Sequence, residues 1–148
     1  MTPYSKIYTS FKKKIEDADL PNFTPEEQEE ILEGYLSSSI SYIFLKGISI
    51  VHDLENRDDE NKCFLDDLLV PEIELVAMFM VVAWYEPKIN SLENTLLMVT
   101  PSGEKWTNQK EHMTALKTAR DFWENKAIGY YSTYKAKYNS YLGNERTN

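Results

Sequence analysis

The residues best suited to chemistry in this chain are two histidines and a single cysteine. A cysteine beside a histidine can act as nucleophile and base, so His52, Cys63 and His112 form one conceivable catalytic set. One cysteine and two histidines also occur together in many chains by chance, and neither histidine belongs to a His-Glu-x-x-His or Glu-x-x-His pattern. We therefore expect a buried or idle thiol, which is typical of a reducing cytoplasm.

The stretch from residue 53 to residue 67 is the most polar in the chain, and its Asp and Glu density invites comparison with a calcium-binding loop. Such a loop starting at Asp53 would need glycine at its sixth position and glutamate at its twelfth, where this chain has Asp58 and Phe64. We expect a solvated loop, with an irregular cation site as the alternative. Phosphate-binding glycine motifs are also absent from the sequence. The sequence thus predicts no enzyme, no cofactor and no metal.

Tyrosine is concentrated near the C-terminus, where five of the ten tyrosines lie between residues 130 and 141. Its large ring with a polar tip suits half-wet contact surfaces better than a dry core. The predicted partner-binding residues are Tyr130, Tyr131, Tyr134, Lys135, Lys137, Tyr138, Tyr141 and Leu142. The alternatives are an amphipathic helix that covers its own bundle and, against the acidity of the rest of the chain, stacking on single-stranded nucleic acid.

Helical periodicity indicates the elements that must position these residues. Apolar residues recur with helical spacing over residues 4–17, 24–46, 71–84 and 107–142. The start at Thr24 is especially clear, because Pro25 suits the first helical position and Glu27 completes a capping box. We expect one all-α domain over residues 1–148, a bundle of about four helices with a long C-terminal helix.

The third of these helices is apolar on nearly all sides, which predicts that it lies at the centre of the bundle. The predicted core residues on it are Ile73, Val76, Met80 and Trp84. Its uninterrupted apolar run, residues 75–85, is about half of the ~20 residues that span a bilayer, so no membrane span is expected. Pro87 should stop or kink it.

The last helix should run from about residue 107 to Leu142, with Gly143 as its C-cap. At 1.5 Å per residue it is about 54 Å long, against about 30 Å for the helix that starts after Thr24. Its end should therefore project, which predicts that residues 130–148 form a docking segment. Before it, Val99 and Trp106 are expected to be short strand ends.

Charge is segregated along the chain, whose net charge is −8. Residues 1–15 carry four Lys and no acid, residues 16–74 carry 17 acids against 3 bases, and residues 105–148 carry 8 bases against 4 acids. This pattern favours either a solvated surface or complementarity between neighbouring copies. A general nucleic-acid binder would need a basic face and is disfavoured.

The segment that leads into the central helix reads Leu68-x-x-Pro71-Glu72-Ile73-Glu74-Leu75-Val76-Ala77-x-x-Met80-x-x-x-Trp84. A short basic helix and a capped long helix precede it, and Trp106 and a long helix ending in tyrosines follow. In this order of elements the chain resembles the head–tail adaptor (connector) proteins of tailed bacteriophages, over most of its length.

The resemblance implies a structural protein of the virion neck, made in the host cytoplasm, whose copies form a dodecameric ring under the portal. The ring would extend the DNA channel and dock the tail, and the C-terminal segment, here residues 130–148, would bind portal and neck or tail proteins. DNA would pass an acidic wall without specific binding, because attraction to phosphates is what makes binding tight. The alternative is a small cytoplasmic acidic helical regulator or inhibitor that binds a partner protein.

Overall fold

The computed structural model describes residues 1–17, 19–98 and 103–145, and the side chains of these residues except 97 and 136–145. The chain is mostly helical, which confirms the all-α class and the long last helix. In order, the elements are β1 (Thr2–Pro3), α1 (Tyr4–Lys12), a short 3-10 helix η1 (Leu20–Asn22), α2 (Pro25–Leu45), β2 (Arg57–Asp58), β3 (Cys63–Phe64), α3 (Val70–Leu97) and α4 (Glu104–Glu145).

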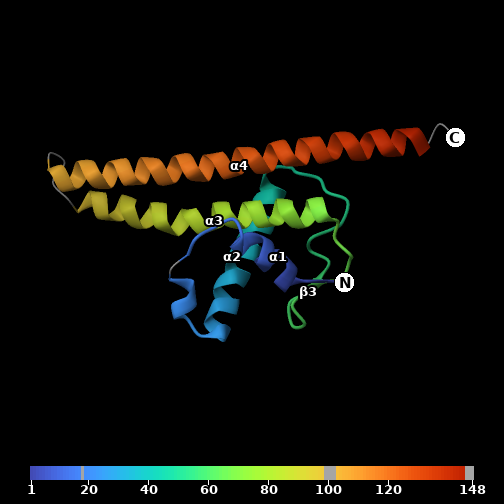
Figure 1. The fold of residues 1–148 in the computed structure, drawn as a ribbon, viewed down its shortest axis with the longest axis horizontal. Helices are drawn as coiled ribbons and strands as arrows, with labels where there is room; N and C mark the ends of the chain where they lie inside the picture. Colours follow the sequence, from blue (N-terminus) through green and yellow to red (C-terminus); the bar gives the residue numbers. More distant parts are fainter. Residues whose placement is uncertain (18, 99–102, 146–148) are drawn as a thin grey trace.

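Helix α3 is the centre of the bundle, as its apolar sequence predicts. It packs against α4 along one side and against α1 and α2 on the other (Figure 1). Val76 and Met80 are fully buried and Trp84 is 9% exposed, whereas Ile73 is only partly buried and packs at the edge of the core. A run of buried residues from 75 to 84 therefore forms the inside of the protein.

Helix α2 begins at the predicted cap. The Thr24 hydroxyl accepts the Glu27 N–H at 3.2 Å, and the Glu27 carboxylate accepts the Thr24 N–H at 2.8 Å. Further along, the buried Ser39 hydroxyl donates to the Val76 carbonyl oxygen at 2.7 Å, so a small residue lets α2 approach α3 closely. The helix ends at Leu45, and Gly47 follows with φ of 67°, a conformation that favours glycine.

The boundaries of α1 and α4 differ from the expected ones. Helix α1 ends at Lys12 rather than near Asp17, because the Asp17 carboxylate accepts the backbone N–H groups that begin the turn into η1. Helix α4 starts at Glu104 and includes Trp106, which is therefore not a strand end, and it continues through Gly143 to Glu145. Val99 lies outside the described residues.

Helix α3 does not stop at Pro87 but continues to Leu97. A proline inside a helix removes one backbone hydrogen bond, at a cost of about 3 kcal/mol. Helix α3 lies against α4 on both sides of the proline, where Arg120 binds Glu86 at 3.2 Å before it and Lys117 binds Glu93 at 2.9 Å after it.

The acidic stretch expected to be a plain loop contributes two strands to a small antiparallel sheet in the order β1-β3-β2. Thr2 pairs with Phe64 on one side of β3, and Arg57 pairs with Phe64 on the other. The Phe64 ring is fully buried and meets the edge of Tyr4 at 5.2 Å between centroids. The first residues of the chain are thus fastened to residues more than sixty positions later.

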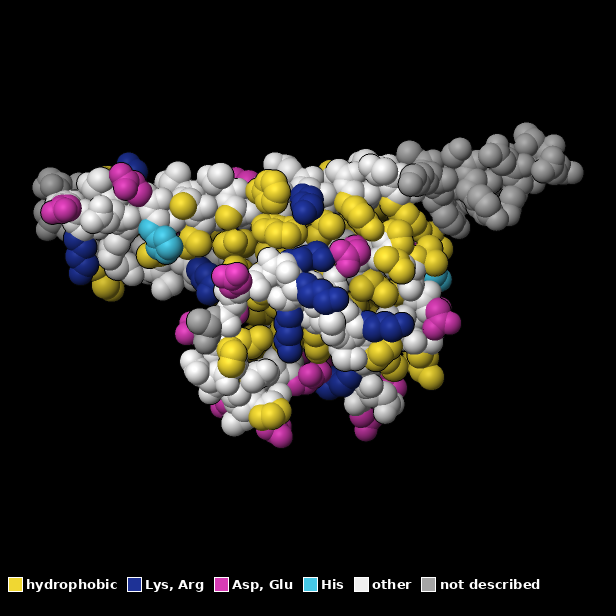
Figure 2. Space-filling model, viewed as in Figure 1, with side chains coloured by type: hydrophobic (Ala, Val, Ile, Leu, Met, Phe, Trp, Pro, Cys, Tyr) yellow, Lys and Arg dark blue, Asp and Glu magenta, His cyan; other side chains and the backbone are white. Residues whose placement is uncertain are grey.

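An ion pair connects the basic N-terminal segment to the acidic one within the same chain: Lys14, just after α1, binds Glu74 on α3 at 2.7 Å. Within the acidic segment, Lys62 binds Glu33 on α2 at 2.7 Å. Figure 2 shows basic and acidic side chains close together over the middle of one face. Part of the charge segregation seen in the sequence is therefore used to hold the bundle together.

Trp84 should be among the most costly core residues to truncate. Its ring meets Tyr85 edge-on at 4.9 Å, and its indole N–H donates to Asp17 at 2.8 Å. We expect Trp84→Ala to lower the free energy of unfolding by about 3–5 kcal/mol, because a large buried ring is removed. Chemical denaturation measures this, and a variant as stable as the parent would show that the ring is peripheral. Phe122→Ala, at an exposed aromatic, is the control.

The tether between α1 and α3 should make stability depend on acid pH. Burial alone would raise the pKa of Glu74, but hydrogen bonds from Lys14 and Ser10 and the charge of Lys14 hold this pKa below its ordinary value. A lowered folded-state pKa stabilises the protein above the unfolded pKa, about 4.3, and this contribution is lost as pH falls through the folded value. Chemical denaturation at about pH 6 and at about pH 3 gives the free energy of unfolding, which should fall less in Lys14→Met than in the parent as the pH is lowered. Equal decreases in the two proteins would contradict this prediction.

Candidate partner-binding surfaces

The predicted C-terminal binding residues divide into two groups. Tyr130, Tyr131 and Tyr134 are partly buried, and the first two pack against the core of their own chain. The Tyr131 hydroxyl also donates to the Ser49 carbonyl oxygen, and burial, with the charge of Glu74, raises the pKa of Tyr130. Lys135 is exposed, whereas the side chains of Lys137, Tyr138, Tyr141 and Leu142 lie outside the described set. The segment expected to project from residue 130 therefore begins on its own bundle.

Helix α4 continues beyond the helix it packs against. It runs antiparallel to α3 and has 42 residues against 28, so at 1.5 Å per residue it is longer by about 20 Å. Figure 1 shows its C-terminal part extending past the N-terminal end of α3. The backbone of α4 therefore offers a helix end that α3 does not cover.

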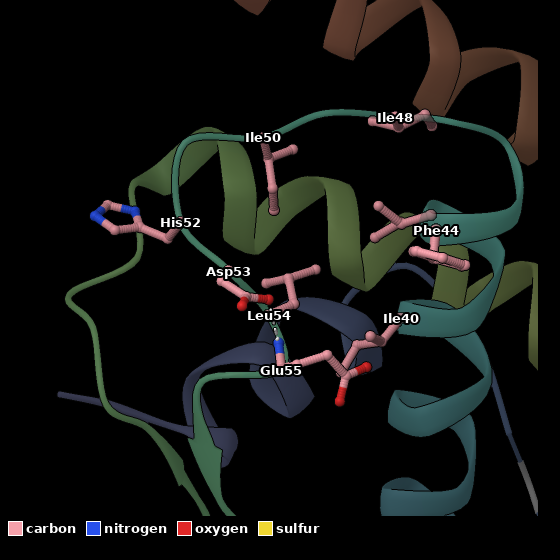
Figure 3. A pocket seen from close by; sticks show the side chains of 9 residues that line it. Ile40, Phe44, Ile48, Ile50, His52, Asp53, Leu54 and Glu55 are labelled. Carbon is pink, nitrogen blue, oxygen red and sulfur yellow. Dashed lines mark hydrogen bonds between the residues drawn. The ribbon is translucent and has the colours of Figure 1, made fainter.

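A second surface is an apolar groove between the end of α2 and the loop that follows it (Figure 3). Its cavity volume is about 190 Å³. The lining residues are Ile40, Ile43, Phe44, Ile48, Ile50, His52, Asp53, Leu54 and Glu55. The floor is formed by side chains that belong to the core, and the carboxylates of Asp53 and Glu55 lie at its exposed rim. We call this feature the α2 groove.

The most exposed apolar side chains beside the α2 groove come from the last turn of α2. Phe44 is 82% exposed and Leu45 is 77% exposed. Figure 2 shows apolar side chains gathered over the loop after α2, below the C-terminal half of α4. Its neighbour Ile43 is on the buried face of α2, so Phe44 points outward. Contiguous exposed apolar surface of this kind commonly marks an interaction site.

A buried carboxylate holds the loop wall of the α2 groove in place. Glu72, in the first turn of α3, is 1% exposed. Its oxygens accept the backbone N–H of Leu69 at 3.2 Å and that of His52 at 3.3 Å, and one lies 2.8 Å from the His52 Nδ1. One side chain thus caps α3 and fixes the loop, so the groove is a constructed feature and not a chance gap.

The residues considered for catalysis have separate structural surroundings. His52 is engaged by Glu72, Cys63 is buried in β3 with its sulfur 4.0 Å from the Met1 sulfur, and His112 is exposed on α4. Around the acidic stretch, Asp58 accepts the backbone N–H groups of Glu60 and Asn61 and so shapes the turn between β2 and β3. Among the described residues, no group of three or more His, Cys, Asp or Glu side chains is arranged to hold a metal ion.

Comparison of the chain with known protein families, curated proteins and solved structures gives no match. Over the residues that the structure describes, no helix combines the length and the apolar character needed to cross a membrane. The α2 groove and the end of α4 are therefore the two surfaces of the chain best suited to bind a partner.

Removing the Glu72 carboxylate should destabilise the fold and loosen the groove. Glu72→Ala leaves the Leu69 N–H and the His52 side chain without their acceptor, which should cost about 1–3 kcal/mol. Glu72→Gln keeps one acceptor oxygen and should cost less. Urea denaturation measures both, and hydrogen exchange at the His52 amide reports on the loop. An alanine variant with unchanged stability and unchanged exchange would show that this carboxylate does not hold the loop.

Proposed function

We propose that this protein is a non-catalytic structural component of a bacteriophage virion, a head–tail adaptor whose copies form a ring under the portal and dock the tail. The observation that supports this most directly is the end of α4. A compact bundle with one helix that continues about 20 Å past its neighbour suits a part that must reach an adjoining subunit.

Two further features support the proposal. The α2 groove adds a second surface, chemically unlike the end of α4, and two unlike surfaces are what a ring of identical subunits needs. The first turns of α2 also expose Glu26, Glu27 and Glu30. A surface of this charge at a channel wall would let DNA pass without binding it, because phosphates are not attracted to carboxylates.

The alternative is that the protein is a small acidic regulator or inhibitor that masks a partner. The same exposed glutamates favour it, because an acidic face can steer association with a basic partner protein. The two proposals differ in stoichiometry. A ring component joins large symmetric assemblies, whereas a regulator forms small complexes of fixed composition.

The proposal is tested by mixing the purified chain with the portal protein of the phage whose genome encodes it. We expect co-elution in a large complex, and a ring of density beneath the portal in electron micrographs. The Debye screening length shortens from about 10 Å at 0.1 M salt to about 3 Å at 1 M, so association aided by charge should weaken over this range. A small complex with a non-portal partner, and no portal binding, would favour the regulator instead.

A further inference from the structure

The α2 groove has the chemistry of a receptor for a basic amphipathic helix. Its floor is apolar, Phe44 is almost uncovered in the single chain, and Asp53 and Glu55 are exposed at the rim. Helices commonly bind such grooves through apolar side chains spaced at three and four positions, while charges at the edge set the orientation. The occupant should therefore be helical, partly aromatic and basic.

The C-terminal end of the chain itself has these properties. The backbone of α4 is helical as far as Glu145. Beyond residue 134 the basic residues are Lys135, Lys137 and Arg146, against one acid. In the same stretch Tyr138, Tyr141 and Leu142 follow at spacings of three and four, which on a helix places them along one face. This stretch therefore supplies both the apolar anchors and the charge that the groove lacks.

The end of α4 cannot reach the groove of its own chain. Lys46, just after α2, forms an ion pair with Glu124, and Ser49 accepts a hydrogen bond from Tyr131. These two contacts place the groove beside residues 124–131 of α4. Tyr141 lies ten positions beyond Tyr131, or about 15 Å further along the helix axis. The helix thus carries its last turns away from the groove.

We propose that the α2 groove of one copy binds residues 136–148 of a second copy, with the tyrosines on the apolar floor and the basic residues facing Asp53 and Glu55. This inference rests on the proposed function, because it names the contact through which neighbouring subunits of the ring join. The two surfaces differ, so the contact is head-to-tail and repeats from copy to copy until a ring closes.

Cross-linking of full-length chains tests the contact directly. One chain carries Phe44→Cys and a second carries Tyr141→Cys, both in a Cys63→Ser background whose fold is checked by circular dichroism. Oxidation of the mixture should give a disulfide-linked pair at a yield at least about tenfold above that of a matched mixture in which Phe122→Cys replaces Phe44→Cys. Phe122 is also an exposed aromatic but lies on α4. Yields equal to this control would overturn the inference.

A charge exchange provides the second test. Asp53→Lys with Glu55→Lys should weaken self-association about tenfold or more in sedimentation, and adding Lys137→Glu with Arg146→Glu to the same chain should restore it. Both groove positions are exposed, so the fold should tolerate the change. No weakening, or no restoration, contradicts the inference. Portal binding without the cross-link overturns only this contact, whereas the cross-link without portal binding overturns only the proposed function.

Discussion

The burial of residues 75–84 of α3 on all sides is the constraint on which the rest of the structure depends. Each fully buried aliphatic side chain contributes about 1.5–3 kcal/mol, and α3 places ten consecutive buried residues, 75–84, in the core. No single neighbour can cover such a helix. Helix α4 covers one side and α1 and α2 cover the other, and the small sheet then fastens the N-terminus beside them.

Features encoded over a few neighbouring residues were predictable from the sequence. The start of α2 follows from Thr24, Pro25 and Glu27, which form their hydrogen bonds within one turn. The central place of α3 follows from the absence of a polar face. The small sheet was missed because its strands have two residues each and pair Thr2 with Phe64, a contact that no local pattern can indicate. A stop at Pro87 was wrong for the same reason, because α3 continues past it beside α4, a neighbour that no local pattern can indicate.

The candidate binding surfaces were only half predictable. The concentration of tyrosines drew attention to the end of α4, but not to the fact that Tyr130 and Tyr131 pack on the core. The α2 groove gave no direct signal in the sequence, because its wall exists only when Glu72 meets His52, twenty positions away. The indirect sign was an acidic residue, Glu72, within an otherwise apolar segment, because a carboxylate that is buried with such a segment needs polar partners from elsewhere in the chain.

Pro87 also divides α3 into two parts with unequal mechanical roles. Before Pro87, α3 is enclosed by three other helices. Between Pro87 and residue 96, every residue except the buried Ile89 is exposed or half-buried. Here α3 and α4 extend together from the bundle as an arm (Figure 1). Local opening costs less where fewer apolar contacts must be broken. The arm should therefore deform more easily than the bundle. A force applied to the arm would separate its two helices locally before it disturbed the core.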